Sequence, residues 1–103
     1  MGNDFFNLLV KLFGEGNVEI IYPNRLEGTI EDMLSDDYKK RFKAEYQQLL
    51  IRYQNLCSFI EKAENEKVKH DCRISLLKEQ RAIMRRYLDI MIERSSEEGC
   101  ELI

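Results

Sequence analysis

Two stretches of this chain decide its fold: DDYKKRFKAEYQQLLIRYQNLCSFIEKA at residues 36–63, and RISLLKEQRAIMRRYLDIMIERSSEE at residues 73–98. Neither stretch contains glycine or proline, and both repeat apolar residues at alternating spacings of three and four. Such spacing keeps the apolar side chains on one side of a helix, and two matching stripes predict helices packed along a shared seam. The sequence therefore predicts a mainly α protein built on a long antiparallel helical hairpin.

The predicted seam takes one large side chain from nearly every turn of each helix. These side chains alternate by three and four positions, so they should face the other helix and be buried there. The members of the predicted seam are Phe42, Tyr46, Leu49, Tyr53, Leu56, Ile60, Leu77, Met84, Tyr87 and Met91.

Polar residues and one glycine mark where the two long helices begin and end. Ser35 is the expected N-cap of the first helix, and Asp71 is the expected N-cap of the second. Gly99 is placed to end the second helix, because glycine readily adopts the left-handed conformation of a helix C-terminus. The polar run 64–71 between the helices contains no glycine, so we expect a turn several residues wide. Folding near this run sets Ser35 opposite Gly99.

The first 34 residues are predicted to extend the hairpin of residues 35–103 within one compact domain. An apolar segment at residues 5–13, with a capping residue before it, predicts a short helix. The β-branched and aromatic run at residues 18–22 predicts a strand. A chain of 103 residues has no room for a second independent core.

Residues 26–30 are compatible with two local structures. They can pair back on the preceding strand as a two-stranded ribbon, or Thr29 can open a short helix with a capping-box pattern. We favour the helix, because an isolated ribbon is marginally stable. The apolar tail 100–103 should pack rather than fray, beside Ile30, Met33 and Leu34.

The composition argues against several classes of partner. With a net charge of −3 and a pI of about 5.2, the chain has no global attraction to nucleic acid or to anionic membranes. Its apolar runs are too short to span a bilayer. Three cysteines, Cys57, Cys72 and Cys100, form an odd set without close spacing. They are typical of reduced thiols, and we expect a cytoplasmic protein.

No pattern of residues predicts catalysis, a cofactor or a metal. The one histidine, His70, lies beside Cys72 in the hinge, but a zinc site normally needs four ligands. The same pair lacks the third, orienting group that an activated cysteine requires. The chain also lacks a glycine-rich phosphate loop and a serine nucleophile motif. We therefore expect a protein that is not an enzyme and has no catalytic, cofactor or metal residues.

Gln80 is a polar residue in the middle of the predicted apolar stripe, between Leu77 and Met84. A buried amide without partners costs about 1–3 kcal/mol, so Gln80 should find a hydrogen bond. Tyr53 and Tyr46 on the first helix and Tyr87 on its own helix are the candidate partners, of which we favour Tyr53 and Tyr87. The contact either fixes the register of the two helices or offers a polar handle to a ligand between them.

A line of cations follows the second helix at Lys78, Arg81 and Arg85, with Leu88 and Ile92 beside it. Such a line is often only a solvated face. Arginines interleaved with aliphatic residues are nevertheless typical of protein interfaces. We therefore take these five residues as the candidate contact surface for a partner or a ligand.

Several apolar residues fall outside the predicted seam, and a single hairpin cannot cover all of them. Either the N-terminal segment or a second molecule must cover them, and we expect a homodimer, because pairing two hairpins into a four-helix arrangement would bury them. These residues are Ile51, Phe59, Ile74, Leu88 and Ile92.

Two segments of the chain carry a resemblance to a known group of proteins. EGTIEDMLSDDYKKRFKAEYQQL at residues 27–49 and LLKEQRAIMRRYLDIMIER at residues 76–94 are similar to short proteins of phages and prophages of Firmicutes and Bacteroidetes. Those proteins are related to a small crAss-like phage protein of unknown function. The resemblance covers about three-quarters of the chain and leaves out residues 1–26. The relatives often carry proline in the hinge, and this chain does not.

The resemblance implies a phage accessory protein and leaves two hypotheses for its function. The first is a module that binds a host protein and inhibits a host defence system, as anti-CRISPR proteins do. The second is a helical bundle that captures a nucleotide or a nucleic acid through its arginines. The first hypothesis is the one that we favour from the sequence.

Overall fold

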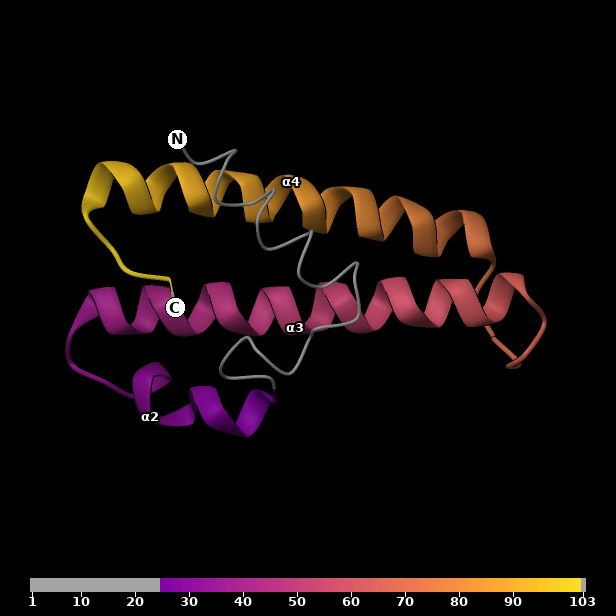
Figure 1. Ribbon diagram of the computed structural model, residues 1–103, viewed down its shortest axis with the longest axis horizontal. Coiled ribbons are helices and arrows are strands. Elements are labelled where there is room, and N and C mark those ends of the chain that lie inside the picture. Colours follow the sequence, from indigo (N-terminus) through magenta and orange to yellow (C-terminus); the bar gives the residue numbers. More distant parts are fainter. Residues whose placement is uncertain (1–24, 103) are drawn as a thin grey trace.

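The computed structural model describes residues 25–102, and every element among them is helical. Figure 1 shows two long antiparallel helices, which confirm the predicted hairpin. The helix predicted at 5–13 and the strand predicted at 18–22 lie outside the described residues. The elements are the 3₁₀ helix η2 (Leu26–Thr29) and the α-helices α2 (Ile30–Met33), α3 (Tyr38–Glu64) and α4 (Ile74–Glu98).

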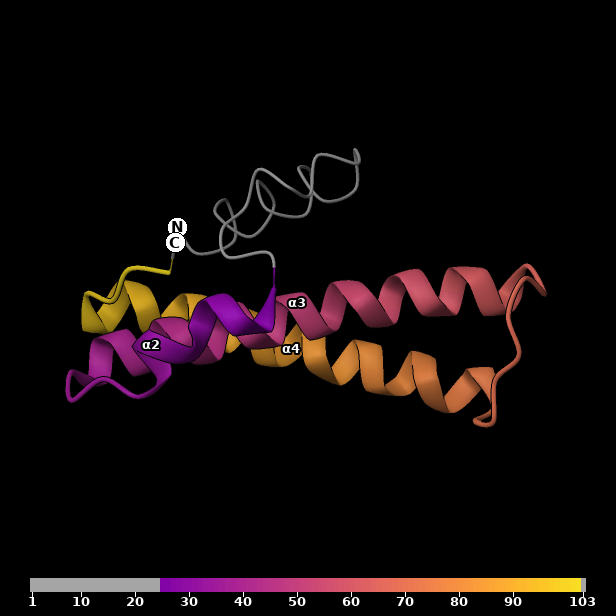
Figure 2. The same cartoon turned by 90° about the horizontal axis from the view of Figure 1, so that it is seen from below.

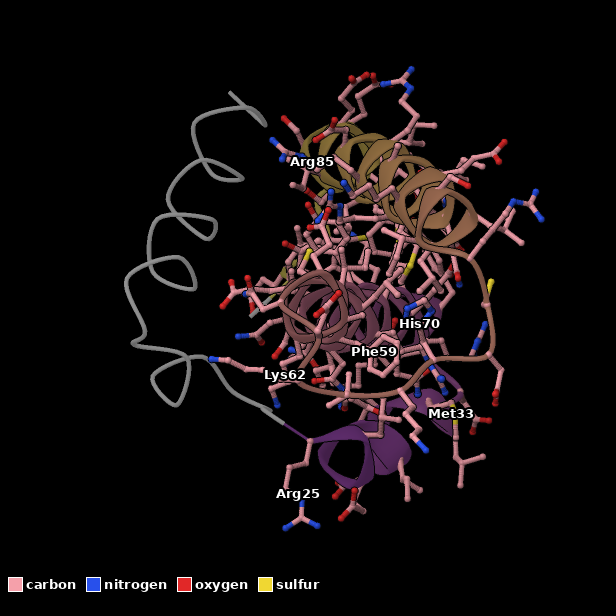
Figure 3. The ribbon with its side chains drawn as sticks, turned by 90° about the vertical axis from the view of Figure 1, so that its right-hand side faces the viewer. Arg25, Met33, Phe59, Lys62, His70 and Arg85 are labelled. Carbon is pink, nitrogen blue, oxygen red and sulfur yellow. The ribbon has the colours of Figure 1, made fainter. Side chains whose placement is uncertain are left out.

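The central element is α3. It packs against α4 on one side and against η2 and α2 on another. Figure 2 shows α2 lying beside the first half of α3, and Figure 3, seen from the hinge end, shows α3 between α4 and α2. Because α3 serves two neighbours, it buries residues on more than one stripe, including Ala44 and Ile51 in addition to Phe42 and Tyr46.

The helix starts differ from the predicted caps by two residues each. Asp37 is the N-cap of α3, and its carboxylate accepts a hydrogen bond of 2.9 Å from the backbone N–H of Lys39. Ser35 lies outside the helix, where its hydroxyl accepts from the N–H of Asp37 at 3.0 Å. The cap predicted at Asp71 is also wrong, because α4 begins after Arg73 without a side-chain cap.

The two long helices end in the same backbone conformation with different residues. Gly99 ends α4 with a φ of 69°, as predicted. After α3, Glu66 has a φ of 59°, which is uncommon for a residue with a side chain. The N–H of Lys67 reaches back to the carbonyl of Lys62 at 2.9 Å and closes this turn. A wide hinge without glycine, residues 65–73, then leads to α4.

The short helix predicted after Thr29 is confirmed, although the capping hydrogen bond is absent. Thr29 is fully buried, donates to the carbonyl of Leu26 at 2.7 Å and accepts from the amide of Gln48 at 2.8 Å. These bonds attach η2 and α2 to α3. None of the described helices combines the length and the apolar character needed to cross a membrane.

The tail packs on the hairpin, as expected, but on a different surface. The buried amide of Gln47 donates to the carbonyl of Leu102 at 3.0 Å. Leu102 joins the core on α3 and α4, whereas its three expected neighbours on and after α2 are exposed. These exposed neighbours are Ile30, Met33 and Leu34.

The main core lies at one end of the hairpin, and its α4 side is rotated from the predicted seam. Tyr87, predicted to be buried, is 43% exposed, whereas Leu88 is fully buried. Of the other predicted members, Phe42, Tyr46, Ile60 and Met91 are buried, and Leu49, Tyr53, Leu56, Leu77 and Met84 are partly buried. The core cluster consists of Phe42, Tyr46, Leu50, Leu88, Met91, Ile92, Cys100 and Leu102.

Candidate functional site

The basic line of α4, defined as Lys78, Arg81 and Arg85, borders the seam with α3. Arg81 and Arg85 are partly buried, and only Lys78 is exposed. This placement follows from the rotation of α4, which turns Leu88 fully into the core and brings the positions one and two turns before it toward α3. The aliphatic part of an arginine can lie along an apolar seam while its guanidinium remains accessible.

Carboxylates hold two of these cations at the seam. Lys78 forms an ion pair with Glu64 at the end of α3, across the hinge. Arg85 lies 3.8 Å from the carboxylate of Asp89, one turn further along α4. Figure 3 shows Arg85 of α4 and Lys62 of α3 on the same side of the hairpin. Lys62 thus adds a cation from α3 to this side.

Tyr53 of α3 lies at the seam beside Arg85. Partial burial raises the pKa of the Tyr53 hydroxyl, and the neighbouring thiol of Cys57 raises it further. A hydrogen bond with Arg85 acts in the opposite direction and lowers that pKa. The site therefore places the aromatic ring and hydroxyl of Tyr53 beside the guanidinium of Arg85 between two helices, which is a chemistry suited to phosphate and base recognition.

Leu88 and Ile92, the aliphatic part of the predicted contact surface, are not available to a partner. Leu88 is fully buried and Ile92 is 2% exposed, since both point into the core between α3 and α4. The predicted mixed surface is thus reduced to its three cations. The prediction that Leu88 and Ile92 contact a partner is wrong, because it placed them outside the seam.

Gln80 is exposed, so the predicted buried amide between Leu77 and Met84 is not present. Tyr87 is also exposed, and its hydroxyl donates to the carboxylate of Glu45 on α3. That hydrogen bond is the largest cause of the raised pKa of Tyr87. Of the three residues predicted to form the polar contact, only Tyr53 is partly buried at the seam, whereas Tyr87 reaches α3 from its exposed edge.

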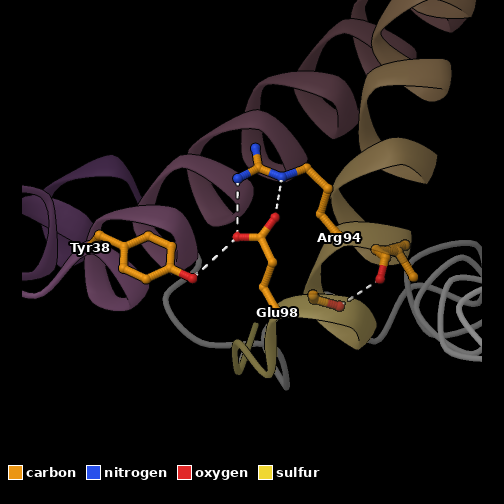
Figure 4. A network of polar contacts seen from close by, with 5 residues as sticks. Tyr38, Arg94 and Glu98 are labelled. Carbon is orange, nitrogen blue, oxygen red and sulfur yellow. Dashed lines mark hydrogen bonds and ion pairs between the residues drawn. The ribbon is translucent and has the colours of Figure 1, made fainter.

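A second polar cluster, not predicted from the sequence, joins the other end of the hairpin (Figure 4). Glu98 accepts hydrogen bonds from Arg94, at 2.7 Å and 3.2 Å, and from the hydroxyl of Tyr38 at 3.3 Å. The guanidinium of Arg94 also lies over the ring of Phe42, 4.7 Å from its centre. The bond from Arg94 lowers the pKa of Glu98. The i,i+4 spacing of Arg94 and Glu98 was the available sequence signal.

Thiols and carboxylates do not gather into a centre within the described residues. No group of three histidine, cysteine or acidic side chains in residues 25–102 is placed to hold a metal ion. Cys57, Cys72 and Cys100 are free thiols, and the ring of His70 faces the carbonyl of Cys72 at 2.7 Å.

Comparison with known proteins gave a match that covers the helical hairpin. No curated protein and no solved structure matched the chain. The model of the Sequestin family matches residues 36–97, which include nearly all of α3 and α4 and the hinge between them. The name of the family suggests binding and sequestering rather than catalysis. Because the match covers more than half of the chain, this protein belongs to the Sequestin family.

Proposed function

We propose that this protein acts by stoichiometric binding and sequesters a soluble ligand of the nucleotide class. The family match supports a sequestering role. The observation that carries the choice of ligand is the partly buried Arg85 beside Tyr53 at the helix seam, with the partly buried Arg81 one helical turn before it. This proposal reverses the order of the two hypotheses drawn from the sequence, because the structure removes the aliphatic half of the predicted protein-binding surface.

The chemistry of these side chains fits a phosphorylated ligand with an aromatic base. A guanidinium can donate two parallel hydrogen bonds to one phosphate group, and Arg81 and Arg85 are one helical turn apart. Partial burial strengthens such bonds, because the effective dielectric near a protein is lower than in water. Tyr53 adds an aromatic ring on which a base can stack, and each stacked base contributes about 1–3 kcal/mol.

The proposed biological setting comes from the resemblance to phage and prophage proteins. In the cytoplasm of an infected bacterium, a protein that captures a signalling nucleotide would block the defence response that depends on that nucleotide. Such a protein needs tight binding and no turnover. A high copy number would serve it better than catalytic residues, which suits a chain of 103 residues.

The test is whether the purified protein carries a nucleotide, and whether the arginines hold it. Protein expressed in a bacterium is purified, its absorbance ratio at 260 and 280 nm is measured, and the heat-released ligand is identified by mass spectrometry. We expect a bound nucleotide in the parent protein and its loss in an Arg81→Gln, Arg85→Gln double variant. Glutamine is chosen because reversed charges at partly buried positions would disturb folding.

The control variant is Lys67→Gln with Lys69→Gln, which removes two exposed positive charges in the hinge. This variant loses the same number of positive charges as the arginine variant, but away from the proposed site. It should therefore keep the nucleotide. An absorbance ratio typical of protein alone, with no binding of added nucleotides by calorimetry, would contradict the proposal. Equal loss of ligand in both double variants would show attraction by net charge and no specific site.

Binding to a host protein is the second candidate function. The observation in its favour is the number of large apolar side chains that remain exposed, among them Leu34 at 73% and Phe59 at 37%. Large exposed apolar patches often mark protein contacts. A pull-down from the natural host would identify such a partner, with the parent protein as bait and the Arg81→Gln, Arg85→Gln double variant as the comparison. A partner retained equally by both baits would place the contact outside the basic line.

A further inference from the structure

A second apolar stripe runs along the exposed side of α4, next to its seam with α3. We call Leu76, Ile83, Tyr87 and Ile90 the outer stripe. Their exposed fractions are 40%, 63%, 43% and 41%, and Gln80 continues the line between the first two. Including Gln80, the spacings along the chain are 4-3-4-3, which is the repeat of a helix that packs against another helix. The stripe is thus a helix-packing surface that no helix among residues 25–102 covers.

The outer stripe is distinct from the surface that binds α3. The α4 residues that pack on α3 include Leu88 and Met91, which are at most 1% exposed. Ile83 is the most exposed large apolar residue of α4, although it lies at the middle of the helix, where solvent exposure of isoleucine is hard to explain in a monomer. Tyr87 lies at the border of the two surfaces, where its bond to Glu45 fixes the ring.

Charged residues flank the outer stripe in a self-complementary order. Glu79 and Arg86 are both exposed and lie on the same edge of the stripe. Neither forms an ion pair with any other residue between 25 and 102. They are seven positions apart, about 10 Å along the helix axis, so they are too distant to pair with each other. Within the described residues, each therefore leaves its charge without an opposite partner.

We infer that the outer stripe is the interface with a second copy of this chain, in which two α4 helices cross antiparallel about a two-fold axis at Ile83. In this register Ile83 meets Ile83 of the second copy, and Leu76 meets Ile90. Glu79 meets Arg86, and the symmetry forms this ion pair twice. In a parallel pairing, the edge that carries Glu79 and Arg86 would face the opposite edge of the stripe on the second copy, so these two ion pairs would not form. The charges therefore select the antiparallel arrangement.

This interface differs from the one expected from the sequence. Ile51, Leu88 and Ile92 were assigned to the dimer surface, but they are at most 8% exposed within a single hairpin. Of that set only Phe59 and Ile74 keep solvent exposure. The inference is independent of any nucleotide, because the outer stripe and the basic line lie on different sides of α4.

The first test is the mass of the full chain in solution, measured by light scattering across a concentration series. The parent protein should have about twice the chain mass of 12.3 kDa. Ile83→Glu should give the mass of one chain with unchanged helicity, because Ile83 is 63% exposed in the hairpin. The control Ala82→Glu adds the same charge one position away, off the stripe, and should remain a dimer. A parent protein that is monomeric at high micromolar concentration overturns the inference, and so does an Ile83→Glu dimer.

The second test fixes the register by charge exchange. Glu79→Arg alone places like charges opposite each other in the antiparallel pairing and should weaken the dimer at least tenfold. Adding Arg86→Glu restores both ion pairs with their signs exchanged, and should recover the parent dissociation constant. A double variant as weak as the single one rules out this register. So does a single variant as tight as the parent, which a parallel pairing predicts.

Discussion

The two halves of the hairpin are built differently. We call residues 38–50 and 86–102 the tail half, and residues 51–85 the hinge half. Every member of the core cluster belongs to the tail half. The hinge half keeps partly buried residues at its seam, including Tyr53 and Arg81, and fully buries few apolar side chains. The tail half thus provides most of the stability, whereas the hinge half carries groups suited to binding.

This difference indicates where the sequence has been shaped for something other than folding. Aliphatic residues at Arg81 and Arg85 would extend the core into the hinge half and stabilise the hairpin. Cations at such positions lose part of their hydration and contribute little to stability even when paired. Their presence at the seam is therefore better explained by a ligand, which agrees with the proposed function.

The largest expected effect compares one leucine from each half. Leu88→Ala in the tail half should lower the free energy of unfolding by about 2–5 kcal/mol, because its fully buried side chain leaves a cavity. Leu77→Ala in the hinge half should cost about 1–2 kcal/mol, because that side chain is only partly buried. Urea unfolding followed by circular dichroism measures both.

Equal losses in the two leucine variants would contradict the division into halves. Tyr87→Ala serves as the control, because Tyr87 lies on the same helix, and was predicted from the sequence to be buried, but is 43% exposed. It should cost less than either leucine variant. A loss in Tyr87→Ala as large as that in Leu88→Ala would restore the seam predicted from the sequence.

Tyr46 allows a test of the tail half in which the substitution should raise the free energy of unfolding. Its side chain is fully buried, and its hydroxyl has no hydrogen-bond partner among residues 25–102. Because an unsatisfied buried polar group is destabilising, Tyr46→Phe should raise the free energy of unfolding by about 1 kcal/mol. The variant should bury the same ring in the same core. Urea unfolding at neutral pH measures the gain, and a loss would show that the hydroxyl has a partner in solution.

The same residue predicts a dependence on pH. Burial raises the pKa of Tyr46 far above its ordinary value of 10.0, because the core disfavours the charged form. The folded state therefore holds this proton more tightly than the unfolded state does. Stability from this group is complete below pH 10 and is lost progressively as the pH rises above it. Tyr46→Phe should lose less stability between pH 9 and pH 11 than the parent, as urea unfolding at both pH values would show.

The hairpin and its end at Gly99 could be predicted from the sequence, but the rotation of α4 could not. Leu77, Met84 and Met91 belong to two alternative stripes. One stripe continues through Tyr87, and the other continues through Leu88. Spacing alone cannot choose between them, and the large ring of Tyr87 favoured the wrong one. The choice depends on what α3 presents, including the carboxylate of Glu45 that accepts from Tyr87.

The candidate site was predictable to the same extent. The periodic order of Lys78, Arg81 and Arg85 is visible in the sequence, and so is the proximity of Asp89 to Arg85. Their partial burial follows from the rotation of α4 and therefore could not be predicted. The pairing of Lys78 with Glu64 depends on how the hinge folds back. The sequence does not predict that shape, because the hinge contains no glycine or proline to fix it.

The smallest expected effect concerns the hinge, where Glu66 has a left-handed backbone with a φ of 59°. Residues with a side chain are strained there, whereas glycine is not, so Glu66→Gly should raise the free energy of unfolding by about 0.5–1 kcal/mol. Gly99→Ala makes the reverse change at the matching end of α4, where φ is 69°, and should cost a similar amount. Added Cβ contacts do not complicate that control, because the nearest atom is the flexible Lys39 Nζ at 3.6 Å. Urea unfolding of both variants measures the pair. A loss of stability in both variants would contradict this prediction. It would show that the side chain of Glu66 stabilises the hinge turn by more than its backbone strain costs.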